Sequence, residues 1–311
     1  MVSQPFALSQ LPLSTWILLA LFRHGCMTRS HLSLVLRSHP DAVRRSLSKL
    51  EKQGFAKGLR IGSHSRVALW IATVLGGMAA SRLSGIEADR RLLQRAERLA
   101  SHIGAHELGT AELLAAFVRV SEPPRRGLTE WKAPWLAARP FRKEIPGSRL
   151  ARYELLPDAA GECLLEGGVA RFFVETDTGT EDLGQVAEKA ERYVRALRAR
   201  RREAPWAVLI ACPTPRRAAN VAEAAGSVLE PGDEDVARFL VGAQPELAGR
   251  SPFAPGVWED AQTGDRASLE ELILWPRERE YSLEDGDFVG FPPRPAVARD
   301  AAGRFARGGG R

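Results

Sequence analysis

The sequence predicts a chain that is α+β overall. A small, mostly helical N-terminal module precedes a larger α/β domain, in which a mixed sheet is flanked by helices. Two patterns predict it. The first 82 residues hold three short helical patterns and a hairpin pattern, and the second half alternates apolar strands with amphipathic helices. The length of 311 residues also favours two domains, because one domain commonly has about 100–200 residues.

The composition excludes several classes of protein. Hydrophobic residues make up 44% and charged residues 26%, which is an ordinary globular mixture. No apolar run approaches the roughly 20 residues that span a bilayer, and no basic stretch precedes the first one, so neither a membrane partner nor a signal peptide is expected. The three cysteines, Cys26, Cys163 and Cys212, are odd in number and far apart, which excludes a disulfide framework and favours the cytoplasm.

The N-terminal module is expected to begin with three helices. The first covers 13–23, where Trp16, Leu19 and Phe22 recur at helical spacing. The second runs through Leu36, with Thr28 or Ser30 as its cap. The third follows the turn at 38–41, has Pro40 in its first turn, and ends at Gly54. A hairpin over 59–71 follows.

Three short helices followed by a basic hairpin are typical of a winged helix-turn-helix, here over residues 10–82. On the third helix Val43, Leu47 and Leu50 share the stripe expected to face the core. The residues expected to face phosphates or base edges are Arg44, Arg45, Ser48, Lys49 and Lys52 on this helix, with Arg60, His64 and Arg66 on the hairpin. A helical module that binds protein is the alternative.

The positive charge is concentrated in this module. Residues 1–82 hold 11 Lys and Arg but only 2 Asp and Glu, whereas the remainder holds 33 basic and 36 acidic residues. A basic module joined to a nearly neutral body indicates a polyanionic partner, most simply double-stranded DNA. The alternative is a solvated basic face that keeps the protein soluble.

Residues 83–127 are expected to connect the two domains. Helices are predicted over 86–105 and 110–120, and the Pro- and Arg-rich stretch 121–127 is read as a break. The second domain is predicted over 128–290, and 291–311 is predicted to be a disordered basic tail.

The second domain alternates strands and helices. Strands are predicted over 152–156, 169–175, 206–212 and 236–241, and helices over 181–201 and 215–228. The stretch 206–212 (WAVLIAC) is continuously apolar, as expected for a strand that is covered on both faces.

Carboxylates follow two of these strands. Asp158 is expected to close the first, while Glu175 and Asp177 at the end of the next are expected to point to one face, because side chains alternate along a strand. Three such oxygen donors could bind Mg²⁺, which would polarise a phosphodiester. On the following helix, predicted to be capped by Thr180, Lys189 could reach these carboxylates. The alternative reading is ordinary turn residues and a lysine that extends along the apolar stripe to solvent.

These residues resemble a known motif. Pro157-Asp158, the run Glu175-Thr176-Asp177 and a helix with Lys189 and Tyr193 look like the PD-(D/E)xK nuclease superfamily, whose fold is a mixed sheet flanked by helices. The resemblance implies catalytic roles for Asp158, Glu175, Asp177, Lys189 and Tyr193, and metal binding by the three acids. One position departs from the motif, because Asp177 stands where the superfamily has lysine.

The sequence is closer to the replication-relaxation family of plasmid and mobile-element proteins. That family joins a winged helix to a domain with Pro-Asp, then Glu-x-Asp-x-Gly-Thr-Glu, then Lys-x-x-x-Tyr, and this chain matches each run at 157–158, 175–181 and 189–193. His106 and Trp131 also lie where landmarks of the family are expected.

Three functions are compatible with the sequence. The first is an accessory DNA-binding protein of plasmid replication and DNA relaxation, without catalysis, whose second domain engages DNA or a partner such as a replication initiator or relaxase. The second is a Mg²⁺-dependent endonuclease or nickase. The third is a transcriptional regulator that forms a homodimer through its second domain.

Overall fold

The computed structural model describes residues 11–60, 68–100, 104–121, 126–144, 151–166, 168–199 and 206–272. The predicted basic tail at 291–311 lies outside these residues, and the described part of the second domain ends at 272.

The N-terminal module has the element order of a winged helix. Its elements are α1 (Leu13–His24), β1 (Met27–Thr28), α2 (Arg29–Val35), α3 (Pro40–Lys52), β2 (Ala56–Arg60) and β3 (Ala68–Ala72). The three strands form an antiparallel sheet in the order β1-β3-β2. The predicted order of three helices and a hairpin is therefore confirmed.

Local sequence signals set the ends of these helices. The Thr28 hydroxyl accepts a hydrogen bond from the backbone N–H of His31 and so caps α2. Pro40 opens α3, where its missing N–H has no helical partner to lose. After α3, Gly54 adopts a φ of 73°, a left-handed conformation that favours glycine.

The segment that follows holds two helices where the sequence predicts one. α5 (Arg90–Ala100) lies within the helix predicted over 86–105, and α4 (Val74–Ser84) precedes it as a helix that the sequence analysis does not predict. Two glycines near the start of α4 weaken its helical pattern, so it escapes prediction. Gly76 has a tertiary reason: a Cβ there would lie 1.9 Å from the carbonyl oxygen of Phe55.

A seven-stranded sheet organises the second domain, in the order β12-β11-β10-β9-β8-β7-β4. The remaining elements are α6 (Gly104–Val120), β4 (Gly127–Lys132), α7 (Pro134–Ala137), β5 (Arg142–Glu144), β6 (Ala151–Tyr153), β7 (Ala159–Leu165), β8 (Gly168–Thr176), α8 (Leu183–Arg198), β9 (Trp206–Cys212), α9 (Pro215–Gly226), β10 (Ala237–Ala243), α10 (Gln244–Arg250), β11 (Trp258–Asp260) and β12 (Arg266–Ala267). The predicted mixed sheet flanked by helices is confirmed.

Strand direction brings the predicted site together. β8, β9 and β10 are parallel neighbours, and β7 runs antiparallel between β4 and β8. The start of β7 therefore lies at the same sheet edge as the end of β8. The prediction that Asp158 closes a strand over 152–156 is wrong. The strand there, β6, ends at Tyr153 and belongs to a separate two-stranded sheet, and Asp158 comes just before β7.

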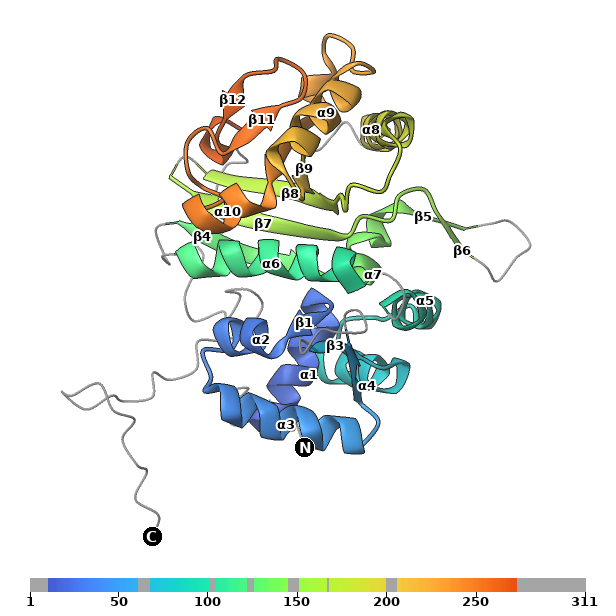
Figure 1. Ribbon diagram of the computed structural model, residues 1–311. Helices are drawn as coiled ribbons and strands as arrows, with labels where there is room; N and C mark the ends of the chain where they lie inside the picture. Colours follow the sequence, from blue (N-terminus) through green and yellow to red (C-terminus); the bar gives the residue numbers. More distant parts are fainter. Residues whose placement is uncertain are drawn as a thin grey trace, which may run out of the picture.

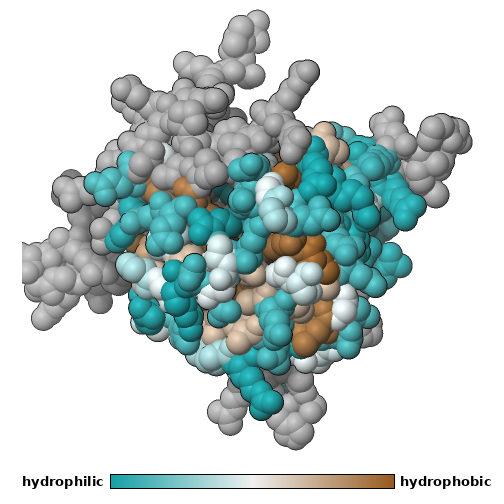
Figure 2. All heavy atoms as spheres, turned by 90° about the horizontal axis from the view of Figure 1, so that it is seen from above, coloured by the Kyte–Doolittle hydropathy of each residue, from teal (hydrophilic) through white to brown (hydrophobic). Residues whose placement is uncertain are grey.

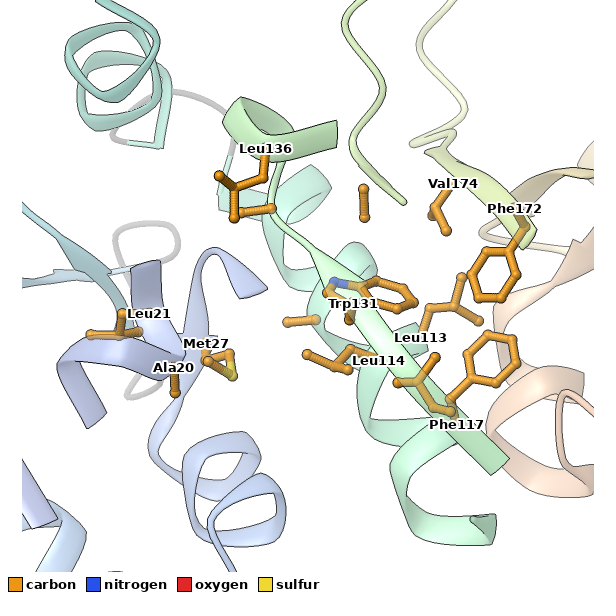
Figure 3. Close-up of a cluster of buried hydrophobic side chains, with 14 of the residues drawn as sticks. Ala20, Leu21, Met27, Leu113, Leu114, Phe117, Trp131, Leu136, Phe172 and Val174 are labelled. Carbon is orange, nitrogen blue, oxygen red and sulfur yellow. The ribbon is translucent and has the colours of Figure 1, made fainter. Parts of the chain in front are cut away.

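The two faces of the sheet carry different layers. α8 and α9 cover one face, and α6 lies between the other face and the winged helix (Figure 1). A single hydrophobic cluster crosses this second boundary, from Leu21 and Met27 through Leu114 and Phe117 to Phe172 (Figure 3). The N-terminal module is thus packed onto the sheet domain rather than tethered to it.

Hydrogen bonds reinforce the junction of the two domains. The backbone N–H of Ala133 donates to the carbonyl of Arg23 at 2.6 Å, and the indole N–H of Trp135 donates to the carbonyl of Phe22 at 2.8 Å. Both bonds satisfy carbonyls in the last turn of α1, which have no partner within the helix.

The face of the molecule farthest from the winged helix, seen from above, is largely hydrophilic with apolar patches between the polar side chains (Figure 2). α8 and α9 turn their apolar residues inward, where Val194, Leu197 and Val221 are buried. None of the helices in the described ranges is long and apolar enough to cross a membrane.

Candidate functional site

The first candidate is the outer face of α3. Val43, Leu47 and Leu50 are buried, as the helical spacing predicts. The five residues expected to meet DNA are all exposed: Arg44, Arg45, Ser48, Lys49 and Lys52. Oδ1 of Asp41 lies 3.6 Å from Nε of Arg44, and an exposed ion pair of this kind contributes little to stability. The basic side chains of α3 are therefore accessible to an external anion such as a DNA phosphate.

The hairpin adds one exposed basic residue to this face of the described chain. Arg60 is exposed at the end of β2, as expected for a residue that meets the DNA backbone. His64 and Arg66 lie outside the described residues.

The second candidate is the edge of the sheet where β7 begins and β8 ends, which we call the acidic edge: Asp158, Glu175 and Asp177. Glu175 and Asp177 point to the face covered by α8 and α9, as the alternation of the strand predicts. The Tyr193 hydroxyl donates to one oxygen of Glu175 at 2.5 Å, and Nζ of Lys189 lies 3.3 Å from the other.

Lys189 reaches the edge from the second turn of α8. Its ammonium also contacts Glu181 at 3.1 Å and so bridges two carboxylates. The helix begins later than expected, because Asp182 and not Thr180 is its cap and accepts from the N–H of Gly184. This leaves Glu181 outside the helix, within reach of Lys189.

Asp177 is held by a residue of α9. Nε of Arg217 donates to Oδ2 of Asp177 at 2.6 Å and Nη2 donates to Oδ1 at 3.2 Å. Such a two-point pair is the strongest form of arginine–carboxylate contact. The same Nη2 donates to the backbone carbonyl of Glu181 at 2.6 Å.

Asp158 faces the other layer. Its Oδ2 accepts from the backbone N–H of Thr176 at 2.7 Å and lies 2.9 Å from Nε2 of His106, on α6. One turn further along α6 the hydroxyl of Thr110 contacts that of Thr176 at 2.8 Å. Because α2 packs on α6, these contacts connect the acidic edge to the layer that carries the winged helix.

Burial and charge shift the protonation of two groups at the edge. Burial, followed by the charge of Asp158, raises the pKa of Glu175 to about 7, although Lys189 and Tyr193 oppose the shift. Burial acts to lower the pKa of His106, but the hydrogen bond and charge of Asp158 outweigh it and raise that pKa to about 9. The shifts favour the charged form of His106 and the protonated form of Glu175.

The acidic edge does not fit a magnesium ion as it stands. Asp158, Glu175 and Asp177 are each engaged by a different cationic side chain, and no group of three or more His, Cys, Asp or Glu side chains suited to a metal occurs in the described part of the chain. Magnesium demands several oxygen ligands in near-octahedral geometry. The predicted metal site therefore stays a prediction without geometric support.

Sequence reasoning missed two contributors to this edge. Arg217 follows β9 by five residues, and since β8 and β9 are parallel neighbours, their following loops meet at one edge. That rule could have found Arg217. The sequence predicts Glu181 as the first residue of a helix over 181–201. Because α8 begins only at Leu183, Glu181 lies before the helix, where its side chain contacts Lys189. Lys189 and Tyr193 lie where the resemblance implies.

Comparison with known families then identifies the chain. The replication-relaxation family matches residues 18–209, more than half of the 311 residues. The chain belongs to the replication-relaxation family. This membership, with the winged helix, makes it a DNA-related replication protein. No curated protein matches the chain.

Several solved structures share some likeness with about a third of this chain. The adhesin competence repressor AdcR of Streptococcus pyogenes shares 25% identity with a TM-score of 0.23, over 35% of this chain and 78% of its own. ZitR of Lactococcus lactis shares 23% with a TM-score of 0.23, over 34% and 80% of the two chains. The transcriptional regulator PA4135 shares 18% with a TM-score of 0.24, over 36% and 80%. TM-scores at this level support no functional conclusion.

Proposed function

We propose that this replication-relaxation protein is an accessory DNA-binding protein of plasmid or mobile-element replication and acts without cleaving DNA. One observation carries the proposal: four basic side chains, Arg44, Arg45, Lys49 and Lys52, project from one exposed face of α3, while its apolar residues are buried. In a winged helix this face enters the major groove. The sheet domain would then engage a partner such as a replication initiator, a relaxase or a second copy.

Binding of this kind has a characteristic dependence on salt. Each phosphate neutralised by a lysine or arginine releases counterions, and lowers the slope of log K against log salt concentration by about 0.9. Replacing two of the four basic side chains of α3 by alanine should therefore make that slope shallower by about 2.

The test is the binding of a fluorescent duplex, followed by anisotropy over a range of salt concentrations. The variant Arg45→Ala, Lys49→Ala is compared with Arg192→Ala, Arg195→Ala, which removes two exposed bases from α8 and serves as the matched control. We expect weaker binding and a shallower slope only for the α3 variant. Equal loss in both variants, or affinity that does not change with salt, would overturn the proposal.

A Mg²⁺-dependent endonuclease is the second candidate. One observation favours it: Asp158, Glu175 and Lys189 meet at one edge of the sheet, with Lys189 3.3 Å from Glu175. Against it, each carboxylate of the edge already has a cationic partner. Incubation of supercoiled plasmid with magnesium and either the wild type or Asp158→Ala, Glu175→Ala distinguishes the two functions. Cleavage by the wild type alone would establish the enzyme.

A further inference from the structure

Arg217 is surrounded by oxygen atoms rather than by a single partner. Three oxygens lie within hydrogen-bond distance of its guanidinium: Oδ2 of Asp177 at 2.6 Å, Oδ1 of Asp177 at 3.2 Å and the carbonyl of Glu181 at 2.6 Å. The side chain of Asp177 is only 3% exposed and that of Arg217 only 16%. A carboxylate and a backbone carbonyl are also the types of oxygen ligand that hard divalent cations prefer.

Local structure positions the backbone of Arg217 and the carboxylate of Asp177. Arg217 lies in the first turn of α9, and its backbone N–H donates to the hydroxyl of Thr214, the cap of that helix. Asp177 is also held in place, because its Oδ1 accepts from the N–H of Gly179. The side chain of Arg217 is long, but its planar guanidinium donates three hydrogen bonds at once, so less conformational freedom is lost for each bond.

The other carboxylates of the acidic edge are also neutralised by cationic side chains. Lys189 lies between Glu175 and Glu181, and His106 lies against Asp158. Three protein cations thus oppose four carboxylates. Little negative charge remains to attract a metal, and a divalent ion brought next to Asp177 would be repelled by the guanidinium.

We propose that Arg217 occupies the place of a divalent cation at the acidic edge. Its guanidinium satisfies Asp177 and the carbonyl of Glu181, so the wild-type protein binds no magnesium there. The edge is a cation site closed by the chain's own arginine, and removal of that positive charge opens it.

The test is a gain of metal binding. Arg217→Gln keeps a polar side chain but removes the charge, and Arg216→Gln, its exposed neighbour on α9, is the matched control. Each protein is titrated with MnCl2 and with MgCl2 in a calorimeter. We expect no saturable binding by the wild type or by Arg216→Gln. For Arg217→Gln we expect one ion per chain, with affinity at least tenfold above any wild-type signal.

A double variant keeps the proposal refutable. Arg217→Gln, Asp177→Asn removes the central ligand as well, and should lose the gained binding. Metal binding by the wild type as tight as by Arg217→Gln overturns the proposal, and so does a folded Arg217→Gln that binds neither ion. Circular dichroism establishes that the variant is folded.

The outcome is separable from that of the proposed function. Arg217→Gln lies in the sheet domain and leaves α3 untouched, so it should bind duplex DNA as the wild type does. A loss of duplex binding in the α3 variant with no gain of metal binding in Arg217→Gln would support the first proposal and refute this one.

Discussion

Replacing Glu175 by glutamine is expected to remove much of the pH dependence of this protein's stability in mildly acidic solution. In the folded protein burial raises the pKa of Glu175 to about 7, whereas its ordinary value is 4.5. Between these two values the folded state keeps a proton that the unfolded chain has released. The free energy of unfolding therefore falls as the pH rises through this window, and the fall is complete above the folded pKa.

The size of the effect follows from the width of the window. Each pH unit within it costs about 1.4 kcal/mol, so Glu175 lowers the free energy of unfolding by about 3 kcal/mol between pH 4.5 and 7. A glutamine carries no charge to bury and can still accept the hydrogen bond of Tyr193. Lys189 retains Glu181 as a partner. Relative to the wild type, the free energy of unfolding of Glu175→Gln should therefore rise by about 3 kcal/mol between pH 4.5 and 7.

Urea denaturation followed by tryptophan fluorescence at a series of pH values measures the effect. Glu191→Gln, on the exposed side of α8, is the matched control and should follow the wild-type curve. His106 titrates in all three proteins, and Glu175 contributes less to its raised pKa than Asp158 and Glu107 do, so most of the contribution of His106 cancels in the difference. If the Glu175→Gln curve runs parallel to the wild-type curve from pH 4.5 to 7, the account of a buried, partly protonated carboxyl is wrong.

Three further predictions test other parts of the structure. His106→Gln should destabilise the protein most below pH 6.5, and the difference should vanish as the pH rises through about 9, because the raised pKa of His106 reflects its pair with Asp158; urea denaturation at pH 6 and above 9 checks this. Gly76→Ala should lower the melting temperature, since its Cβ would lie 1.9 Å from the carbonyl oxygen of Phe55, whereas alanine at the exposed Gly249, which has open space, should cost much less. Trp135→Phe leaves a carbonyl of α1 without its donor and should cost about 1–3 kcal/mol in free energy of unfolding, and an unchanged denaturation midpoint would contradict it.

The sequence alone determined the parts that depend on local pattern. Helical spacing placed Val43, Leu47 and Leu50 inside and the bases of α3 outside, because neighbours on a helix face are fixed by its 3.6-residue period. The continuous apolar run of β9 was found to the residue, at Trp206–Cys212. The alternation of β8 likewise placed Glu175 and Asp177 on one face.

Tertiary structure decided which residues meet. Asp158 joins the edge because β7 runs antiparallel to β8, and its strand was predicted at the wrong residues. Arg217 lies 40 residues from Asp177 in the chain, and only the parallel pairing of β8 with β9 brings them together. Contacts between distant segments depend on strand order and on which layer covers each face, and no local period of the sequence encodes either. The sequence therefore supplied the charges of the acidic edge, and the fold supplied their partners.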